Sequence, residues 1–319
     1  MSKLDQLSFV PERLGKPRMP GSVELQQEIA VIGSERSVSL QLPFLLRDVA
    51  DLGEDWSPFC GLLKQEGIAL QSSVGALEEL PASAVPMRLA RQHVDEAFDP
   101  VEVSTADLIE FSFRQSDCAS WVLPEELGAV GRLPAFLGAL REAASGNAPV
   151  GIEMSLGMSA EDIQAICEMQ VDFISLSEDA SVGRSQDLLM WSVAKVAELS
   201  GEIPLIVNAH LEDDSEIPKL MALGANFVCL DSLLNPMIPE REEDHSGYSA
   251  GRLSSLGVTA APQQSETIAA IEKWFDSLNG QLKQQMLYCG AASLAEFNSG
   301  CLRAASPSAA ALSGTRSFH

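Results

Sequence analysis

Positive charge is scarce in this chain. Lys and Arg number 21 against 45 Asp and Glu, which gives a formal net charge of −24 and a pI near 4.4. So acidic a protein repels polyanions, and we therefore expect neither nucleic acid nor an anionic membrane surface as a partner. A ligand that carries phosphate would have to be held by local backbone amides and cations, against this overall field.

Cysteine motifs and long apolar runs are also missing. The six cysteines are scattered, with no CxxC pair and no Cys/His spacing typical of zinc sites, which favours reduced thiols in a cytosolic protein. No apolar stretch approaches the ~18–20 residues of a membrane span. The N-terminus lacks the apolar segment of a signal peptide. We therefore expect a soluble, cytoplasmic protein.

What the chain does contain is a series of short apolar runs that alternate with amphipathic helical segments, a pattern typical of parallel strands joined by helical crossovers. The expected strands are 38–46, 67–73, 85–91, 106–113, 149–156, 172–177, 204–210 and 226–231. The expected helices are one within 53–66 that begins near Ser57-Pro58, followed by 133–144, 160–169, 187–199, 216–223 and 266–290. We predict an α/β fold of one domain, a (β/α)8 TIM barrel over 36–300. An irregular lead-in over 1–35 precedes it, and a disordered Ala/Ser-rich tail over 301–319 follows.

Polar side chains gather at the carboxyl ends of these strands, where parallel α/β folds place their chemistry. Because side chains alternate along a strand, placing the apolar residues toward the helices turns a polar set into the barrel. This inward set comprises Glu110, Ser112, Glu153, Ser175, Ser177, Asn208, His210, Cys229 and Asp231. We therefore expect a small-molecule ligand at the barrel mouth.

The inward carboxylates would repel one another in a partly buried site, so something must neutralise them. One hypothesis is that Glu153, His210 and Asp231 hold a divalent metal for a lyase or isomerase. The other is that Arg91 or Arg114 pairs with Glu153, because buried charge is usually paired. In that case Asp231 caps the following turn and His210 is an ordinary strand-end histidine.

Five segments, in this order, resemble the FMN-binding (β/α)8 barrel of the glutamate synthases. They are ADLIEFSFRQ (106–115), PVGIEMSL (149–156), ISLSEDASVGRSQ (174–186), ALGANFVCLDSLL (222–234) and MLYCGAASLAEF (286–297). The resemblance implies an FMN-dependent oxidoreductase that passes electrons to an imine in glutamate formation. It implies catalytic roles for Gln115, Glu153 and His210, and cofactor contacts from Ser112, Asp179, Gly183, Ser185, Asn208, Asp231 and Ser232.

Most departures from this family concern the flavin. Ser112 and Glu153 stand where the family has lysines, and the lysine of the QGAKPG turn has become Cys118 or Ala119. The seventh-strand DGG is 208–210 here, Asn-Ala-His, and the eighth-strand Gly-Thr is 231–232, Asp-Ser. Glycine amides and cations are what a flavin phosphate needs, so these changes favour an eroded flavin site. On this interpretation the chain is a catalytically inert barrel, kept as a binding or regulatory partner; the sequence leaves open whether it forms an oligomer or pairs with a partner subunit.

One further departure concerns the iron–sulfur cluster of the family. Its three closely spaced cysteines should follow Cys229, but the next cysteine is Cys289. The sequence therefore predicts that this chain holds no iron–sulfur cluster.

Overall fold

The structure is a computed structural model. It describes residues 3–11, 23–47, 57–71, 86–93, 100–113, 133–144, 146, 148–178, 185–238 and 261–317. Within these residues, no helix combines the length and the apolar character that crossing a membrane requires.

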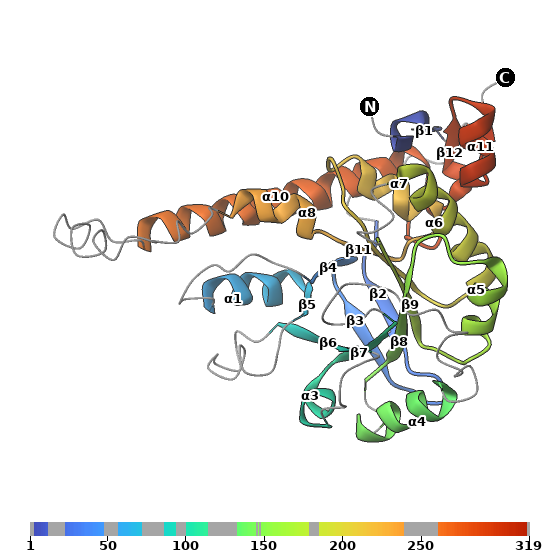
Figure 1. The fold of residues 1–319 in the computed structure, drawn as a ribbon. Coiled ribbons are helices and arrows are strands. Elements are labelled where there is room, and N and C mark those ends of the chain that lie inside the picture. The colour runs from blue at the N-terminus through green and yellow to red at the C-terminus, as the bar shows by residue number, and fades with distance from the viewer. Residues whose placement is uncertain are drawn as a thin grey trace, which may run out of the picture.

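Eight parallel strands close into a barrel, which confirms the predicted fold class (Figure 1). The barrel strands are β4 (Phe44–Leu46), β5 (Ala69–Gln71), β6 (Met87–His93), β7 (Leu108–Ser112), β8 (Val150–Ser155), β9 (Phe173–Ser177), β10 (Leu205–Asn208) and β11 (Phe227–Cys229). Each pairs with the next along the chain, and β11 closes the ring on β4 through Val228 opposite Phe44. Seven of the eight expected runs contain one barrel strand each, and the run 85–91 overlaps β6, which extends two residues further to His93.

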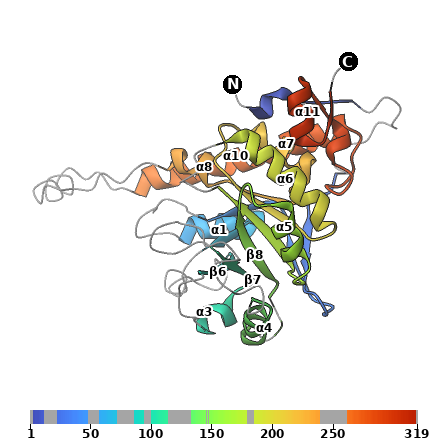
Figure 2. The same ribbon diagram turned by 45° about the vertical axis from the view of Figure 1, so that its right-hand side comes forward.

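Helices cover the outside of this barrel (Figures 1 and 2). They are α1 (Ser57–Glu66), α3 (Pro100–Thr105), α4 (Leu133–Ala143), α5 (Ala160–Cys167), α6 (Gln186–Ser200), α7 (Glu216–Leu223), α8 (Asp231–Leu234) and α10 (Ala261–Tyr288). A 3-10 turn, η3 (Asn235–Met237), directly follows α8. The main apolar core lies between barrel and helices, where outward residues such as Phe44, Ile152 and Val207 are buried. The six predicted helices are thus all present, and α10 starts five residues earlier than expected.

A β-hairpin closes the barrel at the amino ends of its strands. Strands β2 (Gln27–Ala30) and β3 (Ser37–Leu40) pair antiparallel, and Ile29 and Leu40 join the apolar cluster inside the barrel. The buried Asp172 fastens the hairpin, because it accepts hydrogen bonds from the amides of Ile32 (2.6 Å) and Val150 (2.7 Å). The run 38–46, expected as one strand, is therefore divided between the hairpin and the barrel.

The two ends of the chain meet in a small sheet beside α6 and α7 (Figure 1). It contains β1 (Leu7–Phe9), β12 (Leu302–Ala304) and β13 (Arg316–Ser317). The 3-10 turns η1 (Lys3–Gln6) and η5 (Ser299–Cys301) and helix α11 (Pro307–Ser313) flank it. The expectation of a disordered tail is wrong for 302–317, because Leu302, Ala304 and Ala309 bury their side chains and Ser306 caps α11. The lead-in is likewise only partly irregular.

Candidate functional site: a charged layer inside the barrel

The barrel interior has two layers. The lower layer is apolar and lies near the amino ends of the strands, with Leu45, Ala69, Leu89, Leu108, Phe173, Ile206 and Phe227. Gly151 belongs to this level, and a Cβ atom there would lie 2.3 Å from the ring of Phe173 on the neighbouring strand. Only glycine therefore leaves room for that ring.

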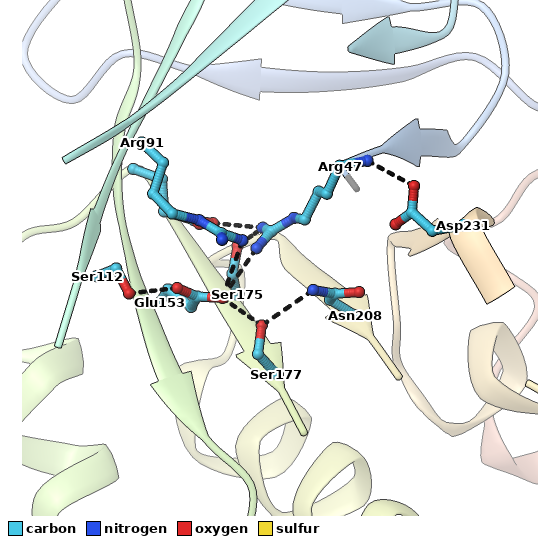
Figure 3. A network of polar contacts seen from close by, with 9 residues as sticks. Arg47, Arg91, Ser112, Glu153, Ser175, Ser177, Asn208 and Asp231 are labelled. Atoms are coloured by element: carbon cyan, nitrogen blue, oxygen red, sulfur yellow. Dashed lines mark hydrogen bonds and ion pairs between the residues drawn. The ribbon is translucent and has the colours of Figure 1, made fainter. Parts of the chain in front are cut away.

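Two residues further along the strands, the interior becomes polar, as side-chain alternation predicts. Two arginines and two glutamates face one another there (Figure 3 labels Arg47, Arg91 and Glu153). Arg47 directly follows β4, and the other three lie on β6, β7 and β8. Arg47 reaches Glu110 through Nη2 (2.5 Å) and Glu153 through Nη1 (3.0 Å). Arg91 reaches Glu110 through Nε and Glu153 through Nη2, both at 3.2 Å. Each charge thus contacts both opposite charges, and the four sum to zero.

Hydroxyl groups complete the charged layer. Ser112 and Ser177 donate to the two oxygens of Glu153, and Arg47 donates to the hydroxyl of Ser175 at 3.0 Å. The amide of Asn208 donates to Ser177 at 3.4 Å (Figure 3). Glu110, Glu153 and the three serines are at most 1% exposed, so ionic and hydroxyl partners replace water around these charges.

The surroundings set the protonation of this layer. Burial opposes the ionisation of Glu153, but the guanidinium groups of Arg91 and Arg47 and the two serine hydroxyls outweigh it and hold its pKa at about 2. Burial likewise opposes the charge on Arg47, yet the neighbouring carboxylates, with Glu110 foremost, raise its pKa. Burial raises the pKa of the Cys229 thiol, which stays neutral. Glu153 is therefore ionised at neutral pH.

Four backbone amides at or just after the strand ends donate to the chain's own side chains. Asp231 accepts from the amide of Arg47 at 2.7 Å, and Glu178 accepts from the amide of His210 at 3.0 Å. Leu211 donates to the hydroxyl of Ser232 at 2.9 Å. One residue on, the amide of Glu212 donates to the buried Glu216 at 2.8 Å. Three of these four amides are thus occupied by carboxylates.

The sequence-predicted site residues divide into three groups. Ser112, Glu153 and Asn208 come together in the charged layer, and Asp231 joins it through the backbone of Arg47. Three others lie outside the charged layer: Ser185, His210 and Ser232. Ser185 caps α6, because its hydroxyl accepts a hydrogen bond from the amide of Leu188 (3.3 Å). The backbone amide of His210 donates to Glu178. Three predicted site residues lie outside the described residues: Gln115, Asp179 and Gly183. The same holds for Arg114, Cys118, Ala119 and the segment 239–260.

The inward orientation predicted for Glu110, Ser175 and Ser177 agrees with the network, and so does the pairing of Glu153 with Arg91. Sequence reasoning missed Arg47, which binds both glutamates. The available signal was an arginine placed directly after the apolar run Phe44–Leu46, at the parity that points inward.

The alternative metal site is not formed. The part of the chain that the structure describes contains no group of three or more His, Cys, Asp or Glu able to hold a metal ion. Both oxygens of Glu153 are occupied by arginine and serine donors, and the guanidinium of Arg47 supplies the positive charge that a cation would bring.

A flavin phosphate does not fit the described strand ends either. The resemblance implies that its phosphate would approach the amides of the seventh-strand glycines, whose positions are Ala209 and His210 here. The amide of His210 already donates to Glu178, and the amide of the next residue, Leu211, donates to Ser232. A phosphate would have to displace these partners and approach the carboxylates of Glu178 and Asp231, which repel it.

Comparison with known proteins identifies the fold. No family model matches this chain, and no curated protein matches its sequence. Among solved structures, a mandelate oxidase variant with a monooxide FMN adduct aligns with a TM-score of 0.60 at 13% identity, covering 92% of this chain and 87% of that chain. Mandelate oxidase with (S)-2-phenylpropionate gives 0.60 at 13% identity, with 93% and 86% covered. A variant with (S)-mandelic acid gives 0.61 at 14%, with 92% and 85% covered.

At these identities the likeness establishes the architecture alone. The class of protein is therefore a (β/α)8 barrel of the kind seen in the FMN-dependent mandelate oxidase.

Proposed function

We propose that this chain is a barrel of flavin-oxidoreductase descent, resembling the glutamate synthase FMN domain, that no longer binds flavin. It acts as a binding or regulatory protein and not as an FMN oxidoreductase. The observation that carries this proposal is the capping of the strand-end amides by the chain's own side chains: Glu178 on His210, Ser232 on Leu211 and Asp231 on Arg47.

The fifth-strand position that lies near the flavin ring in the family supports the same conclusion. A reduced flavin benefits from positive charge near its pyrimidine edge, which the family's fifth-strand lysine supplies. Glu153 stands at that position, and the two arginines in contact with it, Arg47 and Arg91, are neutralised by Glu153 and Glu110. The interior beneath the mouth thus offers no net positive charge to an electron-rich ring.

The proposed ligand is a small polar molecule without phosphate, bound at the barrel mouth. Half-buried polar groups such as Ser155, Asn208 and His210 remain at the strand ends to make hydrogen bonds with it. The strand-end carboxylates and the chain's net charge of −24 disfavour an anionic ligand.

The test uses two flavins that differ only in phosphate. The purified protein is examined for absorbance near 450 nm and then titrated with FMN and with riboflavin, following flavin fluorescence. We expect a colourless protein that binds neither flavin at concentrations up to about 100 μM, a range in which specific sites saturate. Protein that purifies yellow, or that binds FMN at least tenfold more tightly than riboflavin, would refute the loss of the phosphate site and restore the FMN oxidoreductase assignment.

A further inference from the structure

A pocket on the outside of the barrel lies where α6, α7 and α11 meet (Figure 1). Its volume is about 560 Å³, within the roughly 300–1,000 Å³ that is typical of small-molecule sites. One face of α6, the C-terminal turns of α7 and α11, and the turn η5 line it. These residues differ from those of the charged layer and of the barrel mouth, so the pocket is a second candidate site, independent of the proposed function.

Helix α6 supplies an aromatic wall and an ion pair. Four of its residues line the pocket at three- and four-residue spacing, which places them on one side of the helix: Trp191, Ala194, Lys195 and Glu198. Trp191 is half-buried, and the small Ala194 beside it leaves room for a ligand. Lys195 Nζ lies 3.0 Å from Oε2 of Glu198, whose side chain is 68% exposed and can turn toward the pocket.

The ends of two helices give the pocket a negative character. Ala222, Leu223 and the cap Gly224 line it from α7, and Ser313 and the left-handed cap Gly314 line it from α11. The last carbonyls of a helix have no intrahelical partner, and the summed peptide dipoles place partial negative charge there. Both helix ends therefore favour a cation that donates hydrogen bonds.

Two polar side chains of the pocket are already engaged within the protein. Oδ1 of Asn298 accepts from the amide of Gly300 at 3.0 Å, and its Nδ2 donates to the carbonyl of Glu296 at 3.3 Å. The hydroxyl of Ser313 donates to a carbonyl of its own helix at 2.7 Å. The pocket thus offers a ligand chiefly carbonyl oxygens, one carboxylate and apolar surface.

We propose that this pocket binds a small organic cation, a primary amine with an aromatic or alkyl body. The ammonium group donates to the carbonyls that end α7 and α11 and to the carboxylate of Glu198, while the apolar body lies against Trp191 and Leu312. An anion would gain little from Lys195, which is paired with Glu198. The net charge of −24 also draws cations and repels anions.

The test uses three indole compounds that differ in charge: tryptamine is a cation, tryptophol is neutral and indole-3-propionate is an anion. Each is titrated calorimetrically into the full chain at pH 7 in about 0.15 M salt, which screens the long-range field of the protein. We expect tryptamine to bind at least about tenfold more tightly than tryptophol, because only the ammonium gains from the helix ends and Glu198. Indole-3-propionate should bind more weakly than either.

Four variants locate the ligand and test the sign of the charge effect. Ala194→Leu fills the pocket and should abolish tryptamine binding. Glu198→Gln should weaken it about threefold, and Lys195→Gln should strengthen it about threefold, because it removes a like charge and releases Glu198. Glu272→Gln is the matched control: it removes an exposed carboxylate on α10 that does not line the pocket, and it should leave the affinity unchanged.

Several results would overturn the proposal. They are no binding of tryptamine, equal binding of tryptamine and tryptophol, tighter binding of indole-3-propionate, and unchanged affinity in Ala194→Leu, which would place the ligand elsewhere. Circular dichroism shows whether each variant is folded. If Ala194→Leu does not fold, the other two pocket variants decide: opposite shifts of Glu198→Gln and Lys195→Gln support the site, and shifts that are absent or of the same sign refute it.

Discussion

Replacement of Glu153 by Gln tests how the charged layer is held together. Glutamine keeps the shape of the side chain, and its carbonyl oxygen can accept from Arg47 and Arg91 while its amide donates to Ser112. The substitution therefore removes one charge without opening a cavity. What remains is two guanidinium groups facing the single carboxylate of Glu110, with a net charge of +1 out of contact with water.

The magnitude follows from the ionisation of Glu153. Its pKa falls from an ordinary value of 4.5 to about 2, which at about 1.4 kcal/mol per pKa unit corresponds to about 3 kcal/mol of folding free energy. A depressed carboxylate pKa stabilises the fold above pH 4.5, and this contribution is lost as the pH falls toward 2. We therefore expect Glu153→Gln to lose about 3 kcal/mol at pH 7, and the difference from the parent protein to shrink between pH 4.5 and 2.

The assay is urea unfolding of parent and variant at several pH values. The matched control is Glu198→Gln, which also removes a carboxylate, but from the exposed pair with Lys195. That variant should change the free energy of unfolding by less than about 0.5 kcal/mol at every pH. If Glu153→Gln is as stable as the parent at pH 7, or if its deficit does not depend on pH, the arginines do not hold Glu153 as an ionised partner and the reasoning fails.

Two further substitutions test the layers of the barrel. Arg47→Met leaves the two carboxylates to share Arg91. We expect the free energy of unfolding in urea to fall by about 3–5 kcal/mol at pH 7, and by less in acid. An equal loss at all pH values would contradict a charge effect. Gly151→Ala places a Cβ atom 2.3 Å from the Phe173 ring and should cost about 1–3 kcal/mol, and Phe173→Leu in the same chain should recover part of it. Strict additivity of the two losses would show that the two residues do not compete for space.

The barrel was predictable from sequence because its signals are local and repeated. Each strand is a short apolar run, and alternation along it sorts residues between the helices and the interior, as with Ile109 and Glu110. That rule also gave the inward serines. The first strand was predicted too long because periodicity alone does not distinguish one strand from two. Strand β3 lies outside the barrel and pairs with β2, and no local sequence pattern predicts that pairing.

Charge partners were harder to predict, since they depend on which strands are opposite one another across the barrel. Arg91 was predicted as one of two candidate partners of Glu153, whereas its contact with Glu110, which lies opposite it in register, was not predicted. Arg47 follows β4, a strand of only three residues that lies four strands away from β8 across the barrel, so no spacing rule linked it to Glu153. The tail was misjudged by composition, although Ser306-Pro307 and Gly314 mark the start and end of α11.

The closed arrangement of two arginines and two glutamates limits how this barrel can change over generations. Removing any one of the four leaves an odd charge that water does not reach, so single replacements reduce fitness through stability before any new property appears. Substitutions accumulate most easily as opposite-charge pairs, for instance Arg91 together with Glu110. Descendants of this chain would then either keep all four residues or lose them two at a time, so that the charged layer is inherited as a unit.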